Sequence, residues 1–271
     1  MGQQFQSALV GALWGYGQSG SSLSIPLTYW SELPISPADI ADPLLKQATS
    51  APLDFIVALL PMLLVYSDDE AALRRRLRQI GDKTTATAVA AEGTLALRRL
   101  VGAAIARKPL KLAIALPPET KSSCLFPYLS TALAYEESGA GAIQVRNALE
   151  KVVGEPPSNS AAQAATAFTL ALYSALRTPD FPELVGRSLL PLLTPNVAGA
   201  AAAIAGYLCG LVQGPSEMSL ERYQMLSACL PAGSPRVSSA TINQLAQQLH
   251  AAWGGAIPAR LGPAAIAMFN T

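Results

Sequence analysis

The chain has 271 residues, of which 51% are hydrophobic but only 6% aromatic, and its formal net charge is +1. Alanine and leucine supply most of the apolar residues, which favours closely packed helices, because sheets are enriched in Val, Ile, Thr and aromatic residues. The near-neutral charge is not that of a nucleic-acid-binding domain. A single histidine excludes zinc enzymes with several His ligands and, unless His250 serves, most Ser/His and Cys/His nucleophile systems.

The first half of the chain predicts helices separated by loops rich in glycine and proline. A small-residue helix precedes a glycine- and serine-rich loop, and an apolar helix containing Pro61 precedes a short helix that begins with Ser67 and three acids, as in a capping box. The expected helices span residues 7–15, 54–66, 67–81 and 84–107, and the expected loops span 15–24 and 108–119.

The second half predicts a close succession of helices and no strand. The expected helices span residues 126–137, 143–153, 160–177, 182–193, 197–211, 218–230 and 239–253. The linker-like segment 155–160 is followed by another core-like helix, so we interpret it as a loop. The sequence therefore predicts one all-helical domain over 1–271.

The apolar runs of the chain do not predict a membrane protein. The longest, 55–66 and 197–212, are shorter than the roughly 20 residues that span a bilayer. The N-terminus lacks the basic region of a secretory signal, and the cysteines (Cys124, Cys209 and Cys229) lack metal-ligand spacing and are expected to be reduced core thiols. We expect a soluble, cytoplasmic protein with no membrane span and no nucleic-acid partner.

Three groups of residues could carry chemistry, and each has a structural explanation. Asp68 and Asp69 fall in the first turn of a helix, where the helix dipole favours acids. The arginines within 74–78 follow those acids by one turn, which is typical of a solvated, self-neutralised face. His250 lies beside the apolar positions of a helix and is expected at its edge. We predict no catalytic residue and no metal ligand.

Three segments, in order along the chain, resemble the ADP-ribosylglycohydrolases, the all-helical family that includes dinitrogenase-reductase-activating glycohydrolase. Residues 7–26, SALVGALWGYGQSGSSLSIP, are similar to the family opening G-A-L-x-G-x-x-x-G-D-A-L-G-x-P. Residues 55–97 resemble the family's apolar helix followed by a short and then a long helix. Residues 192–214, LLTPNVAGAAAAIAGYLCGLVQG, are similar to the late helix G-G-D-T-D-T-x-A-A-I-A-G-A-L-A-G-A-x-x-G. The resemblance implies a compact orthogonal helical bundle.

The same resemblance implies two magnesium ions that orient ADP-ribose and the attacking water, but the motifs that should hold them are degenerate. Ser19 and Gly20 stand at the opening Gly-Asp, and 194–197 replaces the late Asp-Thr-Asp without a carboxylate. Asp39 and Asp42 lie where the Thr-Asp-Asp-Thr motif is expected but do not match it. Because hard divalent ions require oxygen ligands, chiefly carboxylates, the losses argue against a metal cofactor and against catalysis.

Three functional hypotheses follow. The first is a catalytically degenerate relative that binds a protein partner, or a nucleotide-like ligand, in a cytoplasmic assembly. Its remnant cleft would be lined by neutral residues, Ser19, Ser21, Ser22, Thr194 and Asn196. The second is a magnesium-dependent hydrolase of ADP-ribosyl N-glycosidic bonds with rearranged ligands (Asp39, Asp42 or Asp54). The third is a structural subunit that buries a partner's helix, since charged residues make up only 14% of the chain, against roughly 25% in typical domains.

Overall fold

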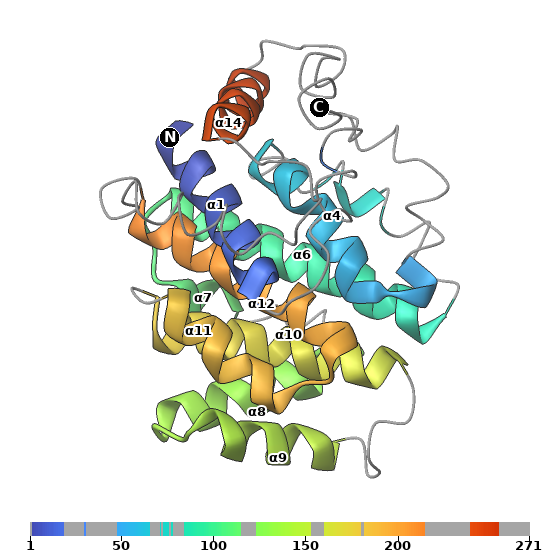
Figure 1. Cartoon of the computed structure of the whole chain (residues 1–271). Coiled ribbons are helices and arrows are strands. Elements are labelled where there is room, and N and C mark those ends of the chain that lie inside the picture. The colour runs from blue at the N-terminus through green and yellow to red at the C-terminus, as the bar shows by residue number, and fades with distance from the viewer. Residues whose placement is uncertain are drawn as a thin grey trace.

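The structure, a computed structural model, describes residues 2–18, 30, 48–65, 71, 73–75, 77, 84–114, 123–152, 160–179, 182–214 and 239–254. Every element in these residues is a helix, which confirms the predicted all-α fold (Figure 1). The elements are α1 (Gly2–Gln18), α4 (Pro52–Val65), α6 (Thr85–Ile105), α7 (Leu110–Ile114), α8 (Phe126–Glu137), α9 (Ala142–Val152), α10 (Ser160–Arg177), α11 (Pro182–Leu189), η3 (Leu190–Leu192), α12 (Pro195–Gln213) and α14 (Ser239–Trp253).

The α1–α12 pair forms the centre of the molecule and brings two backbones into direct contact. A Cβ atom added at Gly11 would lie 2.1 Å from the carbonyl oxygen of Gly206, and one at Gly15 would lie 2.0 Å from that of Ala202. The pairing runs in opposite directions along the two helices, so they are antiparallel. Residues 198–211 of α12 are all buried, because other helices cover the faces that α1 leaves open.

Two predicted loops, 15–24 and 108–119, are helical in part, each for a physical reason. The first helix was expected over 7–15 with a loop from Gly15, but α1 runs from Gly2 to Gln18. Gly15 does not end the helix. It is a glycine because the backbone of α12 at Ala202 lies so close that a Cβ atom would not fit. The predicted loop 108–119 contains α7, in which Leu110 and Ile114, four residues apart, both pack against the core.

Helix α4 is buried along almost its whole length and contains Pro61. Proline has no N–H, so the carbonyl four residues earlier, on Val57, lacks its helical donor. The indole Nε1 of Trp30 donates to that oxygen at 3.0 Å, and the hydroxyl of Tyr207 donates to the oxygen of Leu60 at 2.9 Å. Two buried tertiary hydrogen bonds thus hold α4 at its proline. Within the described residues, no helix combines the length and hydropathy needed to cross a membrane.

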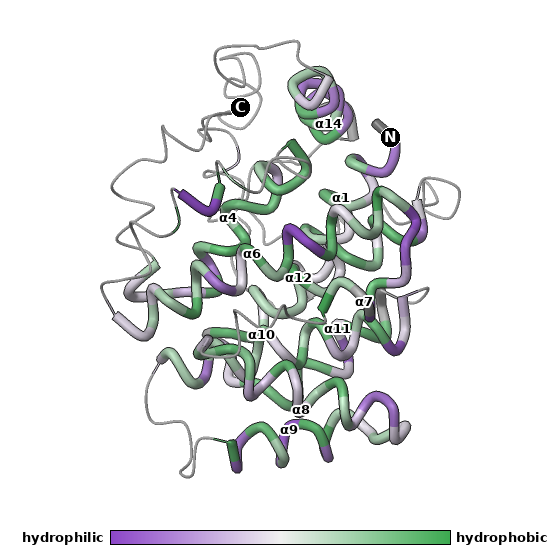
Figure 2. Tube along the Cα trace, turned by 180° about the vertical axis from the view of Figure 1, so that it is seen from behind, coloured by the Kyte–Doolittle hydropathy of each residue, from purple (hydrophilic) through white to green (hydrophobic). Residues whose placement is uncertain are grey.

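Helices α8 and α9 form an outer layer with a different composition. Figure 2 shows hydrophilic positions along α9, whereas α4 is hydrophobic along nearly all of its trace. Only Val145 and Leu149 of α9 are buried. A carboxylate on α6 caps the start of α8: the two oxygens of Glu92 accept the N–H groups of Cys124 at 3.2 Å and Leu125 at 3.0 Å.

The remaining expected helices agree with the structure where it describes them. Of the predicted helix 67–81, residues 71, 73–75 and 77 are helical, and Leu73 and Leu77 are buried as expected. Four further helices, α8, α9, α10 and α14, begin and end within one residue of the expected bounds 126–137, 143–153, 160–177 and 239–253. The helix expected over 218–230 lies outside the described residues.

Candidate functional site

The antiparallel α1–α12 pair has two ends with different polar groups, and both are candidate sites. At one end α1 finishes beside the first turns of α12, and α4 begins nearby. At the other end the first turn of α1 lies beside the last turn of α12 and the end of α6 (Figure 1). Thr194, which was predicted from the family resemblance, lies at the first end, and a cavity of about 950 Å³ lies at the second.

The predicted remnant cleft is described only in part. Ser19, Ser21 and Ser22 lie outside the described residues, as does the side chain of Asn196 in the first turn of α12. Thr194 is exposed at the N-cap of α12, where its side chain makes no capping hydrogen bond. It lines an open cavity of about 400 Å³ together with α9 and α10, and the described residues do not place it beside the predicted serines.

Asp54 is the one carboxylate of the hydrolase hypothesis that the structure describes. It lies in the first turn of α4, where burial raises its pKa to about 6. The pKa of Tyr16 on α1 is raised to about 12, first by burial and then by the charge of Asp54, so the two groups are neighbours. Within the described residues, no three His, Cys, Asp or Glu side chains gather closely enough to hold a metal ion; Asp39 and Asp42 lie outside those residues.

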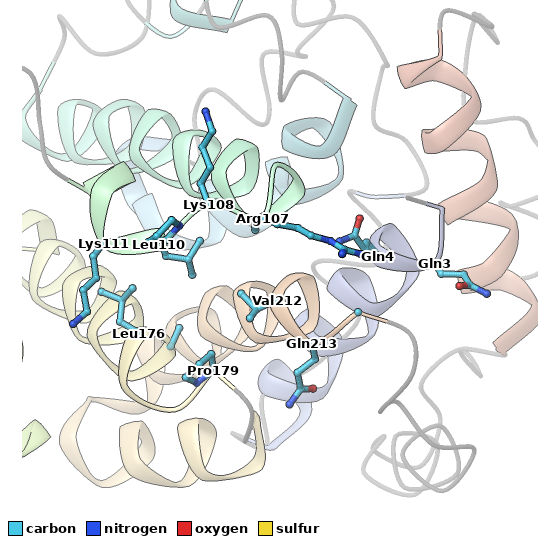
Figure 3. A pocket seen from close by; sticks show the side chains of 14 residues that line it. Gln3, Gln4, Arg107, Lys108, Leu110, Lys111, Leu176, Pro179, Val212 and Gln213 are labelled. Atoms are coloured by element: carbon cyan, nitrogen blue, oxygen red, sulfur yellow. The ribbon is translucent and has the colours of Figure 1, made fainter.

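At the opposite end is a cavity of about 950 Å³, which we call the basic pocket (Figure 3). Its cations are Arg107, Lys108 and Lys111, which follow the end of α6, and none of the described residues that line it is acidic. Its other walls carry the amides of Gln3, Gln4 and Gln213 and the apolar side chains of Ala104, Leu110, Ala175, Leu176, Pro179 and Val212.

The three cations of the basic pocket differ in orientation and pairing. The Nζ of Lys111 lies 2.7 Å from a carboxylate oxygen of Glu136, which offsets its charge. Arg107 and Lys108 are exposed, and neither side chain forms an ion pair or hydrogen bond with the described part of the chain. In Figure 3 Arg107 extends from the end of α6 toward Gln4 of α1, whereas Lys108 points upward, away from the other labelled side chains, and Lys111 points downward beside Leu176.

Helix dipoles reduce the positive potential of the basic pocket without cancelling it. The ends of α6, α10 and α12 face the cavity, and each carries roughly half a negative charge, while the start of α1 contributes about half a positive charge. The sum is close to one negative charge. Arg107 and Lys108, whose side chains have no ion-pair partner in the described part of the chain, supply two positive charges. The basic pocket therefore retains a net positive charge and favours an anion.

The backbone at Arg107 is strained. Its φ is +53°, its N–H donates to the oxygen of Ala104 at 3.1 Å, and the N–H of Lys108 donates to that of Ala103 at 2.8 Å. This is a Schellman motif, in which the left-handed position is usually glycine. A residue with a Cβ atom costs about 1 kcal/mol there.

Helix α8 ends in the same motif with glycine at the left-handed position. Gly139 has a φ of +73°, and its N–H donates to the oxygen of Glu136 at 3.1 Å. The N–H of Ala140 donates to the oxygen of Tyr135 at 3.1 Å, which completes the motif. The two helix ends therefore have the same hydrogen bonds, and they differ in the residue that occupies the strained position.

The sequence contained a signal for the basic pocket that we did not use. Arg107 and Lys108 directly follow the predicted helix 84–107, and Lys111 comes one turn later. Their proximity to α1, α10 and α12 depends on long-range packing, which the local pattern does not show.

The other reactive side chains in the described residues have structural roles. Burial, followed by the charge and hydrogen bond of Glu92, raises the pKa of the Cys124 thiol to about 12. Cys209 is buried in the core and Cys124 is partly buried, and neither forms a disulfide within the described residues; Cys229 lies outside those residues. The ring of His250 stacks on Trp253 with centroids 6.0 Å apart and meets the edge of Phe5 at 5.9 Å, so it joins α14 to α1.

Comparison with known proteins identifies no relative. No family model matches the chain, and neither a curated protein nor a solved structure matches it.

Proposed function

We propose that this chain is a non-catalytic binding module of ADP-ribosylglycohydrolase-like architecture that holds a small anionic ligand in the basic pocket. The observation that carries the proposal is the cavity of about 950 Å³, where Arg107 and Lys108 have no ion-pair partner among the described residues and none of the described lining residues is acidic. The order of the three family-like segments supports the architecture. The degenerate acidic motifs support binding without catalysis.

The chemistry of the lining favours a nucleotide-like ligand. Cavities that bind small molecules have volumes of about 300–1,000 Å³, with mostly apolar walls and a few placed polar groups. Here the cations would bind phosphate, the glutamine amides would bind hydroxyl or ring nitrogen atoms, and Leu110, Leu176 and Val212 would cover an apolar body. The ligand would thus combine one or more phosphates with a sugar or a base.

Thermal unfolding with and without ligand tests this proposal, because a ligand that binds only the native state raises its stability. We expect ADP-ribose or AMP to raise the Tm in the absence of Mg²⁺, and adenosine, which lacks the phosphate, to raise it much less. Lys108→Ala should reduce the shift. Arg187→Ala removes an exposed charge from α11, away from the basic pocket, and should leave it unchanged. No shift with either nucleotide would refute the proposal.

A second candidate, the magnesium-dependent hydrolase with rearranged ligands, is favoured by Asp54. A carboxyl with a pKa of about 6 is well suited to accept or donate a proton near neutral pH. This hypothesis predicts that Mg²⁺ and the protein together release ADP-ribose from ADP-ribosylated protein and that Asp54→Asn abolishes the release. A wild-type chain that releases none under these conditions is not such a hydrolase.

The hypotheses of a protein partner and of a buried partner helix rest on the low charge content of the sequence. The large apolar side chains that are exposed in the described part of the chain lie on three helices, namely Ile143 and Val152 on α9, Leu184 on α11 and Val212 on α12. Val212 belongs to the basic pocket. We therefore assign no protein-binding face.

A further inference from the structure

We infer that Arg107 contacts the charged group of the ligand, that this group is a phosphate-type oxyanion, and that the fold gives up stability to place arginine there. The inference rests on the proposed function, because it names the contact and the ligand class of the basic pocket. It adds a specific residue and a stability effect that binding alone does not require.

The first step is the backbone. The ends of α6 and α8 form the same pair of hydrogen bonds around a left-handed residue, which is Arg107 in one and Gly139 in the other. Glycine adopts this conformation without strain, whereas any residue with a Cβ atom is strained. Arginine at 107 therefore makes the end of α6 less stable than glycine would.

The second step excludes a purely structural explanation. A cation near a helix C-terminus interacts favourably with the helix dipole, which could justify an arginine at this position. Lys108 is the next residue and supplies a positive charge at the same helix end without a left-handed backbone. Arg107 is exposed and forms no ion pair within the described part of the chain, so no structural contact offsets its strain.

The third step is the direction of the side chain. From the end of α6 Arg107 extends across the basic pocket toward Gln4 in the first turn of α1 (Figure 3). An oxyanion bound between them would meet the planar fork of a guanidinium, an amide donor and the positive end of the α1 dipole. The guanidinium fork matches two oxygens of one phosphate, which a lysine ammonium does not.

The test measures the Tm of the free protein and the affinity for AMP by calorimetry, on the full chain. Arg107→Gly should raise the Tm by about 2–4 °C, because it relieves the strain, and should weaken AMP binding at least about 10-fold. Arg107→Ala removes the same contact but keeps a Cβ atom, so it should weaken binding equally without the gain in Tm. Arg107→Lys should bind AMP with intermediate affinity.

Two controls make the comparison sharper. Gly139→Arg places an arginine in the same motif on α8, where the nearest atom to its Cβ is Nη1 of Arg177 at 4.0 Å, and should lower the Tm without changing AMP affinity. Inorganic phosphate and adenosine serve as separate probes. Binding of phosphate as tight as that of AMP would identify an oxyanion site without a nucleoside contribution, and binding of adenosine as tight as that of AMP would overturn the oxyanion assignment.

The failures are distinguishable. A wild-type chain that binds neither AMP, ADP-ribose nor phosphate refutes the proposed function itself. A wild-type chain that binds AMP while Arg107→Gly binds it equally well overturns the role of Arg107 and leaves the proposed function standing. An Arg107→Gly variant no more stable than wild type overturns the stability effect.

Discussion

The α1–α12 pair and the α8–α9 pair bring helices together in opposite ways. Between α1 and α12 small residues recur every four positions, and the backbones touch at Gly11, Gly15 and Gly206. Helices α8 and α9 are consecutive and are joined by residues 138–141, and α9 is buried through two side chains only. In α9 only Val145 and Leu149 are buried, and Ile143 is 64% exposed.

This difference determines how much change each region tolerates. A side-chain interface can adjust its rotamers, so its outer positions accept substitution at little cost. A backbone contact has no such freedom, because a single added methyl group must separate the helices. We therefore expect substitutions at the α1–α12 contact to change the free energy of unfolding most. The change should be smaller on the face of α12 that contacts α4, smaller again at the start of α4, and smallest on the surface of α9.

The largest effect is expected for Gly206→Ala. Its Cβ would lie 2.1 Å from the carbonyl oxygen of Gly11, so α1 and α12 must move apart. We expect a loss of about 3 kcal/mol or more in the free energy of unfolding, measured with urea. Gly141→Ala is the matched control, because no atom lies within 4 Å of its Cβ, and should change stability by less than about 0.5 kcal/mol. Equal stability of the two variants would contradict the close contact.

The next effect is expected for Tyr207→Phe, on the face of α12 that contacts α4. The substitution removes the donor to the oxygen of Leu60 and leaves that carbonyl buried. We expect a loss of about 1–2 kcal/mol in urea unfolding. Tyr135→Phe, on the partly exposed α8, removes a hydroxyl that forms no hydrogen bond with the described residues, and should cost less than about 0.5 kcal/mol. If both variants unfold alike, the Tyr207 hydrogen bond does not stabilise the core.

A third, smaller effect depends on pH and concerns Asp54 at the start of α4. Burial raises its pKa from 3.8 to about 6, so the folded protein disfavours the charged carboxylate. Below pH 4 the carboxyl is protonated in both the folded and the unfolded state and does not lower the free energy of unfolding. Between pH 4 and pH 6 the unfolded state loses its proton first, so stability falls as pH rises, and above pH 6 the loss is complete.

Asp54→Asn should therefore be more stable than wild type at pH 7.5 and equally stable below pH 4. Urea unfolding at the two pH values measures the difference. The difference in stability should be modest, because Asp54 is only partly buried and solvent screens its charge. Parallel pH profiles of the variant and the wild type would show that Asp54 titrates normally in the folded protein.

The smallest effect is expected on the surface of α9. Ile143→Ser changes an exposed side chain and should alter the free energy of unfolding by less than about 0.5 kcal/mol. Leu149→Ala, on the buried stripe of the same helix, should cost about 2 kcal/mol or more. Thermal and urea unfolding of the pair show whether α9 has the one-sided packing that its burial indicates, and a costly Ile143→Ser would contradict it.

Local sequence patterns predicted most of the described helices but not their partners. Apolar spacing and helix caps depend only on residues that are near in sequence. The helices over 126–137, 239–253 and 84–107 could therefore be predicted. Gly15 was misplaced in a loop because the reason for a glycine there is the carbonyl of Ala202, far away in the sequence. The same limitation hid α7, whose Leu110 and Ile114 face a core built by other helices.

The candidate sites show the same division. The family resemblance directed attention to Thr194 and Asn196, which the structure places at the start of α12, but only the side chain of Thr194 is described. The basic pocket was missed because its walls come from four regions of the chain. The left-handed backbone of Arg107 could not be predicted, since its sequence carries no glycine at the end of α6.

The antiparallel α1–α12 contact also determines when the protein can fold during its synthesis. Helix α1 is made before α12, and its partner segment follows about 200 residues later, which takes roughly 10–40 s at typical rates of translation. During that interval the small-residue face of α1 is exposed on the nascent chain. Contacts so distant in sequence slow folding relative to helical proteins with local contacts, so the central pair of this bundle completes its assembly only when α12 has left the ribosome.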